Sequence, residues 1–453
     1  QYSYIMYHRL RVGLLVVFCL SIGNLFGLFA QHSTDYYSLS MVGNAGNGIF
    51  APYYLSANKH GLVTHSKSGY LRASVFKGLE MNKRFSYEFG IDLVGLMSST
   101  SPVSYYSDGN LKTYNPGVSS FFIQQAYIGM KYRMIFISAG CRELTDEVVN
   151  FELSSGGLVW SGNARPIPQV RAGFIDFVDI PFTKGWVQIK GELAYGKFMD
   201  NDFLRDHYNY YNQYITTDAL YHHKSISFRS NPDKPFVVTI GAELAAQFGG
   251  TKRYYEKGIL IDSLTMKSPT RLKDFFKILF PSSGDGQTNE GDQAYYYGNH
   301  VGQWNLSAEY RFKDNSSVRG YFEWYFDDAS GMGKFNGWDG LWGLEYKSGK
   351  KNWLSNVVLE YLDMTNQSGP LNWCPSDYND PKLDIEATGA DDYYNNYFYN
   401  GWAHYGLSNG TAMAKSLLYN TDGYMRYKHN RIRGVHLGAS GYICLLYTSP
   451  SPR

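Results

Sequence analysis

The pentapeptide Gly406-Leu407-Ser408-Asn409-Gly410 is the residue pattern most typical of a catalytic site in this sequence. Its spacing matches the G-x-S-x-G turn of serine hydrolases, which holds a nucleophilic serine between a buried strand and a helix. The preceding residues, 395–405, are polar and aromatic, unlike a buried strand. A triad also needs an acid and a histidine further along the chain, and the residues after Gly410 are too few to complete such a fold. We therefore predict a glycine-rich loop here, no catalytic residue, and a protein that is not an enzyme.

Two other groups of side chains have the chemistry of metal ligands. His222 and His223 are adjacent, but neighbouring residues of a strand point to opposite faces and cannot both bind one metal in regular geometry. Asp285, Glu290 and Asp292 lie in a loop with glycines that could hold calcium, but their spacing differs from that of known calcium loops. We predict no metal site and no cofactor.

Carboxylates and aromatic rings are the remaining chemical groups of interest. A pair of carboxylates for glycoside hydrolysis cannot be singled out, because Glu323, Glu345 and Glu360 suit a structural role equally well. Aromatic residues are frequent in polar segments, and flat rings beside amide and charged groups suit sugars, which have apolar C–H patches and many hydroxyls. The same rings also suit the aromatic girdle of a membrane protein. The residues alone leave both interpretations open.

Strands with period-two alternation are the elements that would position these groups. Apolar and polar residues alternate from Phe85 to Met97 and from Trp304 to Phe312, and again over 187–195, 236–244 and 318–326. Such alternation predicts strands with one apolar and one wet face. The runs reach the roughly 9–11 residues that a tilted strand needs to cross a bilayer. Aromatic residues at their ends are typical of interfacial girdles, so the pattern favours a membrane β-barrel over a soluble β protein.

Long polar segments separate the predicted strands. They cover residues 98–119, 199–222, 281–298 and 365–401, and we expect them to be loops, which in outer-membrane barrels face outward when they are long. Residues 269–280 differ, because Leu272, Phe275, Phe276 and Leu279 follow helical spacing. This spacing predicts a short amphipathic helix packed on or inside the barrel.

Residues 1–30 are typical of a leader region. We expect translation to begin at Met6, followed by a basic stretch and the apolar run Val12–Leu20. A small residue, Ala30, then precedes the expected mature start at Gln31, as in a cleaved secretory signal peptide. The apolar run is shorter than the ~20 residues that a spanning helix needs.

The other end of the sequence is unusual. Residues 444–453 resemble a translated sequencing adapter, so we interpret residues 31–443 as a single β-barrel domain that lacks its last strand or strands. Outside the two ends, Cys141 and Cys374 are the cysteines that remain, and two distant cysteines make neither a disulfide framework nor a metal-ligand spacing.

The composition agrees with an exported barrel. Charged residues make up 18% of the chain, against about 25% in ordinary globular proteins. Aromatic residues make up 17%, including 41 tyrosines, yet the mean hydropathy is negative, as expected where lipid-facing and lumen-facing residues alternate. A net charge of +2 gives no reason to expect nucleic acid as a partner. We expect outer-membrane lipid around a monomer.

Four segments resemble one protein family in their order and spacing. They are Ala51–Gly61, which contains a proline followed by aromatic residues, then Gly157–Arg171, Tyr221–Ser225 and Gly401–Gly406. The family is the Wzi capsule-assembly proteins of the bacterial outer membrane, and the resemblance covers residues 45–443. It implies a barrel of about 18 antiparallel strands with a helical element. It also implies a lectin without enzymatic activity that tethers polysaccharide.

On this basis we expect an outer-membrane, lectin-like protein that binds and anchors capsular or exopolysaccharide at the cell surface. A porin or a polysaccharide-export channel is the alternative, and a barrel-embedded hydrolase with Ser408 as nucleophile is a third. The resemblance supplies no ligand residues to carry over. The candidate carbohydrate-binding residues are therefore aromatic and basic residues of polar segments: Trp160, Arg165, Arg171, Trp338, Trp373, Tyr393, Tyr394 and Trp402.

Overall fold

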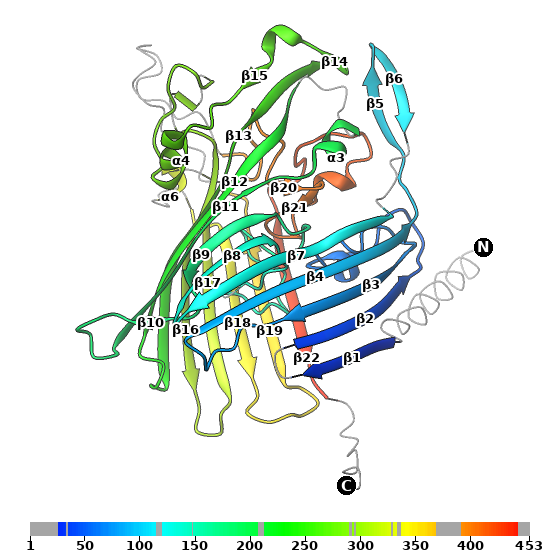
Figure 1. Ribbon diagram of the computed structural model, residues 1–453. Coiled ribbons are helices and arrows are strands. Elements are labelled where there is room, and N and C mark those ends of the chain that lie inside the picture. Colours follow the sequence, from blue (N-terminus) through cyan, green and yellow to red (C-terminus); the bar gives the residue numbers. More distant parts are fainter. Residues whose placement is uncertain are drawn as a thin grey trace.

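One large antiparallel sheet dominates the fold (Figure 1). The computed structural model describes residues 26–442 except 33–34, 115–119, 147, 207–212, 290–291, 294–295, 328, 333–336 and 368–390. The sheet curves into a wall around an interior that connecting segments occupy. This confirms the expected all-β, antiparallel barrel-type fold.

The wall is built from strands that pair mostly in chain order. Its first part consists of β1 (Phe26–His32), β2 (Asp35–Asn44), β3 (Ser68–Lys77), β4 (Phe85–Ser98), β7 (Phe121–Tyr132), β8 (Ile135–Cys141) and β9 (Gln169–Phe174). Its second part consists of β10 (Val178–Asp179), β11 (Val187–Lys197), β12 (Gln213–Ser230), β13 (Phe236–Glu256), β16 (Asn299–Arg311), β17 (Ser317–Phe326), β18 (Gly340–Lys347), β19 (Asn356–Asp363) and β22 (Arg433–Ser440).

Short elements decorate this wall. The strands β14 (Ile259–Leu260) and β15 (Met266–Lys267) pair with β13, while β5 (Val103–Ser107) with β6 (Asn110–Tyr114) and β20 (Ala403–His404) with β21 (Leu407–Ser408) form separate hairpins. The α-helices are α2 (Tyr53–Ser56), α3 (Asn201–Asp206), α4 (Leu272–Leu279) and α6 (Ala329–Met332). Among the described residues, no helix is long and apolar enough to cross a membrane.

The two outermost strands of the wall are β1 and β22. In the described ranges β1 pairs with β2, β22 pairs with β19, and no ladder joins β1 to β22, so the wall is an open curved sheet. The strand β1 includes residues 26–30 of the predicted leader. Cleavage before Gln31 stays a prediction.

The wall turns its apolar face outward and its polar face inward. On β4, Tyr87 and Ile91 are 54% and 52% exposed, whereas Glu88 and Asp92 on the other face are 5% and 0% exposed. Leu437 on β22 is 69% exposed in the same way. This arrangement is the reverse of that in a soluble protein. In a membrane barrel, lipid surrounds the apolar outer face and the polar groups lie inside.

The connections divide the wall into two ends (Figure 1). At one end, which we call the turn end, strands are joined by short segments such as 133–134, 231–235 and 312–316. At the other, the loop end, long segments carry the β5–β6 hairpin, α3 and α4. Bacterial barrels place short turns in the periplasm and long loops outside the cell.

Two predicted loops are wrong in part, and the first is 98–119, which contains the β5–β6 hairpin. Residues 199–222 were expected to be a loop, but Gln213–His222 belongs to β12. The strands β12 and β13 are 18 and 21 residues long, and at the loop end they extend beyond the strands on either side of the pair. The extension of β12 carries polar residues such as Thr216, which hydrogen-bonds to Asn400 and Phe398 of an inner segment, so no apolar alternation marks it as a strand.

The interior is filled by two segments far apart in the sequence, 148–168 and 391–432, which we call the plug. Trp402 Nε1 donates a 2.7 Å hydrogen bond to the carbonyl of Val159, and the Tyr394 hydroxyl donates a 2.6 Å bond to that of Leu158. Inward-facing residues of the wall hold the plug backbone: Leu158 N–H donates to Glu323 at 2.8 Å. The plug therefore packs against itself and hydrogen-bonds to the wall.

Candidate functional site

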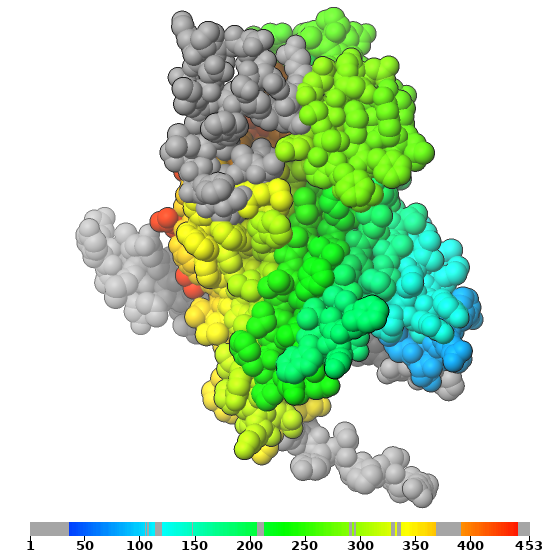
Figure 2. Space-filling view, turned by 90° about the vertical axis from the view of Figure 1, so that its left-hand side faces the viewer, coloured from blue at the N-terminus to red at the C-terminus, as the bar shows by residue number. Residues whose placement is uncertain are grey.

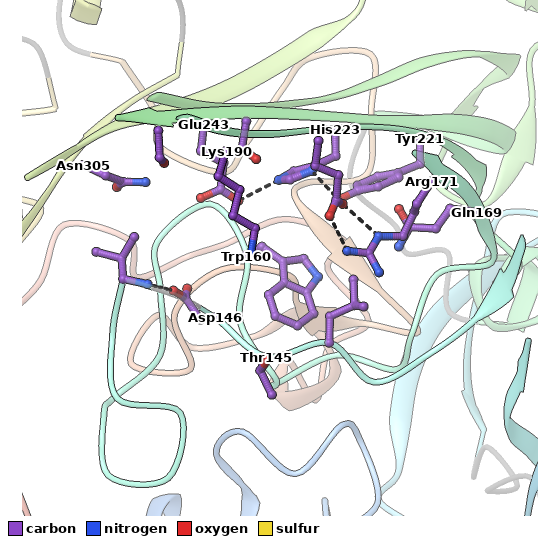
Figure 3. A pocket seen from close by; sticks show the side chains of 15 residues that line it. Thr145, Asp146, Trp160, Gln169, Arg171, Lys190, Tyr221, His223, Glu243 and Asn305 are labelled. Atoms are coloured by element: carbon purple, nitrogen blue, oxygen red, sulfur yellow. Dashed lines mark hydrogen bonds and ion pairs between the residues drawn. The ribbon is translucent and has the colours of Figure 1, made fainter. Parts of the chain in front are cut away.

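A cavity of about 110 Å³ lies inside the wall, between the plug and the inner faces of β9, β11, β12, β13 and β16 (Figure 3). Because alternate residues of a strand share a face, each strand of the wall contributes cavity-lining residues that are two positions apart. The wall residues are Gln169, Arg171, Lys190, Glu192, Tyr221, His223, Ser225, Ser227, Glu243 and Asn305, and the plug side includes Asp146, Val148 and Trp160.

An ionic network covers the wall side of the cavity. The Arg171 guanidinium binds both carboxylate oxygens of Glu192, through a 2.8 Å bond from Nε and a second bond from a terminal nitrogen. His223 Nε2 lies 2.8 Å from a carboxylate oxygen of Glu243, and Gln303 donates to the other oxygen at 3.1 Å. A bidentate guanidinium–carboxylate pair fixes both groups in one orientation. The network therefore presents a rigid array of hydrogen-bonding groups.

Trp160 provides the opposite side of the cavity. Its side chain is half-buried, and in Figure 3 the indole lies below Lys190 and Arg171 and faces the ionic network. Tyr221 lines the cavity as well, and its ring stacks on the buried Trp402 at 6.1 Å between centroids. A flat apolar ring opposite charged and hydroxyl groups is the combination that a sugar ring requires.

The position of the cavity along the barrel follows from the strand ends. Lys190 lies near the start of β11 at Val187, and Ser227 lies near the end of β12 at Ser230. Both of these strand ends belong to the turn end. Gln169 and Tyr221, which both pair with Gly196, line its other end, so the cavity runs along most of β11, below the extensions of β12 and β13.

The structure brings two of the candidate residues together, Trp160 and Arg171, and separates the others. Arg165 lies elsewhere in the plug, with its guanidinium 3.8 Å from the ring centre of Phe122 and 4.7 Å from that of Tyr405. Burial lowers the pKa of Arg165. Trp338 is 64% exposed and stacks on Trp324 at 4.8 Å, away from the cavity.

Tyr393, Tyr394 and Trp402 were chosen as aromatic residues of polar segments, but the structure buries them. All three are 0% exposed and belong to the core of the plug. Their segment is polar, but several of its polar groups are hydrogen-bonded inside, since Tyr394 and Trp402 donate to plug carbonyls and Asn430 donates to the carbonyl of Tyr393. Trp373 lies outside the described residues.

The expected absence of a serine elbow agrees with the local geometry. Ser408 is 0% exposed and lies in the short β20–β21 hairpin, paired with Ala403 in an antiparallel ladder. A nucleophile elbow needs a strand-to-helix turn that exposes the serine. Ser408 therefore lacks the setting of a hydrolase nucleophile.

The two histidines point to opposite faces, as predicted. His223 faces the cavity, while His222 faces outward and its ring contacts Tyr195 at 4.5 Å. In the described residues no group of three histidine, cysteine, aspartate or glutamate side chains has the geometry of a metal site. Asp285 of the acidic loop is paired with Arg271 and Lys273 instead.

Sequence reasoning missed Glu192, His223 and Glu243 as partners in one network. The alternation in 187–195 and 236–244 placed Glu192 and Glu243 on polar faces, which was the available signal. Their meeting depends on ladders that set Ala194 opposite both Arg171 and His223, and Ser225 opposite Glu243. The sequence of a single segment does not determine such a pairing register.

A second buried polar group lies at the loop-end side of the plug, around His404. Its Nδ1 lies 2.9 Å from the carbonyl of Arg165, and its Nε2 accepts a 3.2 Å hydrogen bond from the Met199 N–H. Both contacts fit a neutral ring with its proton on Nδ1. Burial lowers the pKa of His404 and raises that of the neighbouring Asp200.

Comparisons with known proteins give only distant matches. No family model matches this chain, and neither does any curated protein. Among solved structures, the chain is similar to Wzi from Escherichia coli, described as an outer-membrane protein involved in group 1 capsule assembly and a carbohydrate-binding β-barrel. The TM-score is 0.46 and the identity 13%, over 84% of this chain and 63% of Wzi, so the chain spans less than two thirds of that protein.

A second similar structure is the outer-membrane channel DcaP from Acinetobacter baumannii. Its TM-score is 0.26 and the identity 11%, over 76% of this chain and 91% of the channel. One of the two proteins binds carbohydrate and the other is a channel.

Proposed function

We propose that this protein is a non-catalytic outer-membrane barrel that binds capsular or exopolysaccharide and holds it at the cell surface. The observation that carries the proposal is the cavity in which Trp160 faces the Arg171–Glu192 and His223–Glu243 pairs. Protein sites for sugars combine an aromatic face with convergent hydrogen-bonding groups, because a pyranose has apolar faces and a rim of hydroxyls. Figure 3 displays this combination.

Two further observations support the location and the absence of catalysis. The outward apolar face, with residues such as Ile91 and Leu437 open to the surroundings, suits a wall surrounded by lipid. The carboxylates of Glu192 and Glu243 each accept hydrogen bonds from fixed partners, which favours a structural and binding role over proton transfer.

A binding measurement tests the proposal. Oligosaccharides from the surface polysaccharide of the source bacterium would be titrated into the full-length protein in detergent micelles. We expect Trp160→Ala to weaken binding by about tenfold or more, since a tryptophan that the bound ligand covers is worth at least about 1.4 kcal/mol. Trp338→Ala, which removes an exposed tryptophan away from the cavity, is the matched control and should bind as the wild type does.

Two results would count against the proposal. One is equal affinity of the Trp160→Ala variant and the wild type for the oligosaccharides. The other is a gene deletion that leaves surface polysaccharide as firmly attached to the cells as before.

A channel is the second candidate, because charged residues such as Lys190 and Glu192 line the inner face of the wall. The plug packs across that interior with buried aromatic residues, which favours a closed lumen. Sustained conductance of the wild type in planar bilayers, without added ligand, would favour the channel over the closed polysaccharide-binding barrel.

A further inference from the structure

The helix α4 lies on the outer face of the wall, not in its interior. One side of it packs on outward residues of β11 and β13, since the Phe275 ring lies 5.3 Å from that of Tyr195 and 5.2 Å from that of Phe248. Ile278 is completely buried in the same small cluster. Figure 1 shows α4 beside the upper parts of β12 and β13, and Figure 2 shows the light-green segment around it protruding from the wall.

A lysine of the wall fixes the end of this helix. Lys224 lies on the outward face of β12 and its ammonium group donates to the carbonyls of Ile278, at 3.1 Å, and Leu279. These carbonyls belong to the last turn of the helix, where a cation is favourable. The orientation of α4 about its own axis is thereby set.

With one side packed, α4 presents a second apolar side to its surroundings. Leu272, Phe276 and Phe280 are 76%, 55% and 69% exposed. They are spaced by four residues, so they form one stripe along the helix and its C-terminal cap. Three large apolar side chains at this exposure are costly in water.

The stripe continues the lipid-facing surface of the wall. On the outward face that α4 covers at Lys224, the next position of β12 toward the turn end carries the exposed Ile226, and further along the same face of β13 lies the exposed Ile240. These residues are part of the apolar outer face. The helix therefore lies at the boundary of that face toward the loop end, where the hydrocarbon of a membrane meets its headgroups.

Basic side chains border the stripe. Arg271, Lys273 and Lys277 all converge on Asp285, at 2.8, 2.9 and 3.6 Å. Asp274 pairs with Arg271 as well, so three cations face two carboxylates and one positive charge is left over. Lysine and arginine next to an apolar stripe are the features of helices that lie in the interface of an anionic membrane.

We propose that α4 is an interfacial anchor for anionic lipid: Leu272, Phe276 and Phe280 insert among acyl chains, and Lys273 and Lys277 meet lipid phosphates. The proposal rests on the membrane location given under the proposed function, but not on sugar binding. Equal oligosaccharide affinity of Trp160→Ala and the wild type would count against the sugar site and would leave the anchor intact.

Hydrogen exchange of the full-length protein in proteoliposomes tests the anchor. We would compare vesicles of phosphatidylcholine alone with vesicles containing phosphatidylglycerol, and follow the backbone amides of α4. In the anionic vesicles these amides should exchange about tenfold more slowly, because each lysine gains favourable energy at an anionic surface. The Lys273→Gln/Lys277→Gln variant should lose this dependence on lipid charge.

The apolar half has its own variant. Leu272→Ser/Phe276→Ser/Phe280→Ser should exchange about tenfold faster than the wild type in both vesicles, as expected when apolar side chains no longer enter the bilayer. Leu111→Ser is the matched control, because Leu111 is 59% exposed on the β5–β6 hairpin at the loop end. It should leave α4 unchanged.

The exchange of β12 and β13 amides reports whether each variant has folded. If these amides stay protected and α4 exchanges equally in both vesicles and in all variants, the anchor is refuted. Slower exchange in anionic vesicles that survives in the Lys273→Gln/Lys277→Gln variant would refute the phosphate contacts.

Discussion

Replacing Trp402 tests whether the plug core is described correctly. The indole is completely buried, stacks on Tyr221 and meets Phe198 edge-on at 6.4 Å. Its Nε1 donates to the carbonyl of Val159 at 2.7 Å. Trp402→Ala removes all of these contacts and leaves a cavity, which should lower the free energy of unfolding by about 3–5 kcal/mol.

The variant Trp402→Phe separates packing from hydrogen bonding. Phenylalanine keeps most of the ring but leaves the buried carbonyl of Val159 without its donor, which should cost about 1–3 kcal/mol. We therefore expect the order wild type, Trp402→Phe, Trp402→Ala in decreasing stability. Trp338→Ala, at an exposed position, should cost about 1 kcal/mol or less.

The assay is urea unfolding in detergent micelles followed by far-ultraviolet circular dichroism, which does not depend on tryptophan emission. Limited proteolysis without urea reports separately whether the plug has loosened inside an intact wall. The reasoning is refuted if Trp402→Ala unfolds at the wild-type urea concentration and its plug resists protease. If that variant keeps its stability but loses oligosaccharide binding, Trp402 is a ligand residue and our placement of it in the core is wrong.

Two further predictions concern buried positions of the plug. Burial holds the pKa of His404 below its ordinary value of about 6.5, so the folded protein keeps this histidine neutral. The contribution of His404 to stability is therefore complete above about pH 6.5 and is lost as pH falls toward the folded pKa. Melting temperatures measured above and below this pH should show the loss in the wild type and a smaller one in His404→Gln. Gly410→Ala should destabilise the protein by about 2 kcal/mol or more, because its new methyl group would clash with the carbonyl of Leu158. Gly286→Ala is the control, because its methyl group would enter open space. Equal urea midpoints for the two variants would contradict the prediction.

The wall could be predicted from the sequence because its signal is local. Alternation over 85–97 and 304–312 corresponds to β4 and β16, and the helical spacing near Leu272 corresponds to α4. Each pattern indicates which side of one element is apolar, and this can be recognised without knowing which other elements it packs against. The extension of β12 lacks such a pattern, because residues such as Ile215 and Thr216 are buried and Thr216 hydrogen-bonds to the plug.

The candidate site was predictable only in part. Trp160 and Arg171 were chosen for their side-chain chemistry, and they do line one cavity. The same criterion selected Tyr393, Tyr394 and Trp402, which are buried. The hydrogen-bond acceptors of Tyr394 and Trp402 lie more than two hundred residues away in the sequence, at Leu158 and Val159, so composition could not distinguish a buried polar segment from an exposed loop.

The separation of those partners has a consequence for the time course of folding. The Tyr394–Leu158 and Trp402–Val159 bonds span 236 and 243 residues, and nearly all wall strands after β8 lie between them. Closing such long loops is slow and is rewarded only by late contacts. We therefore expect the plug to lock last, after the wall has assembled around it, with the aromatic residues of its second half exposed until then to whatever accompanies the chain to the membrane.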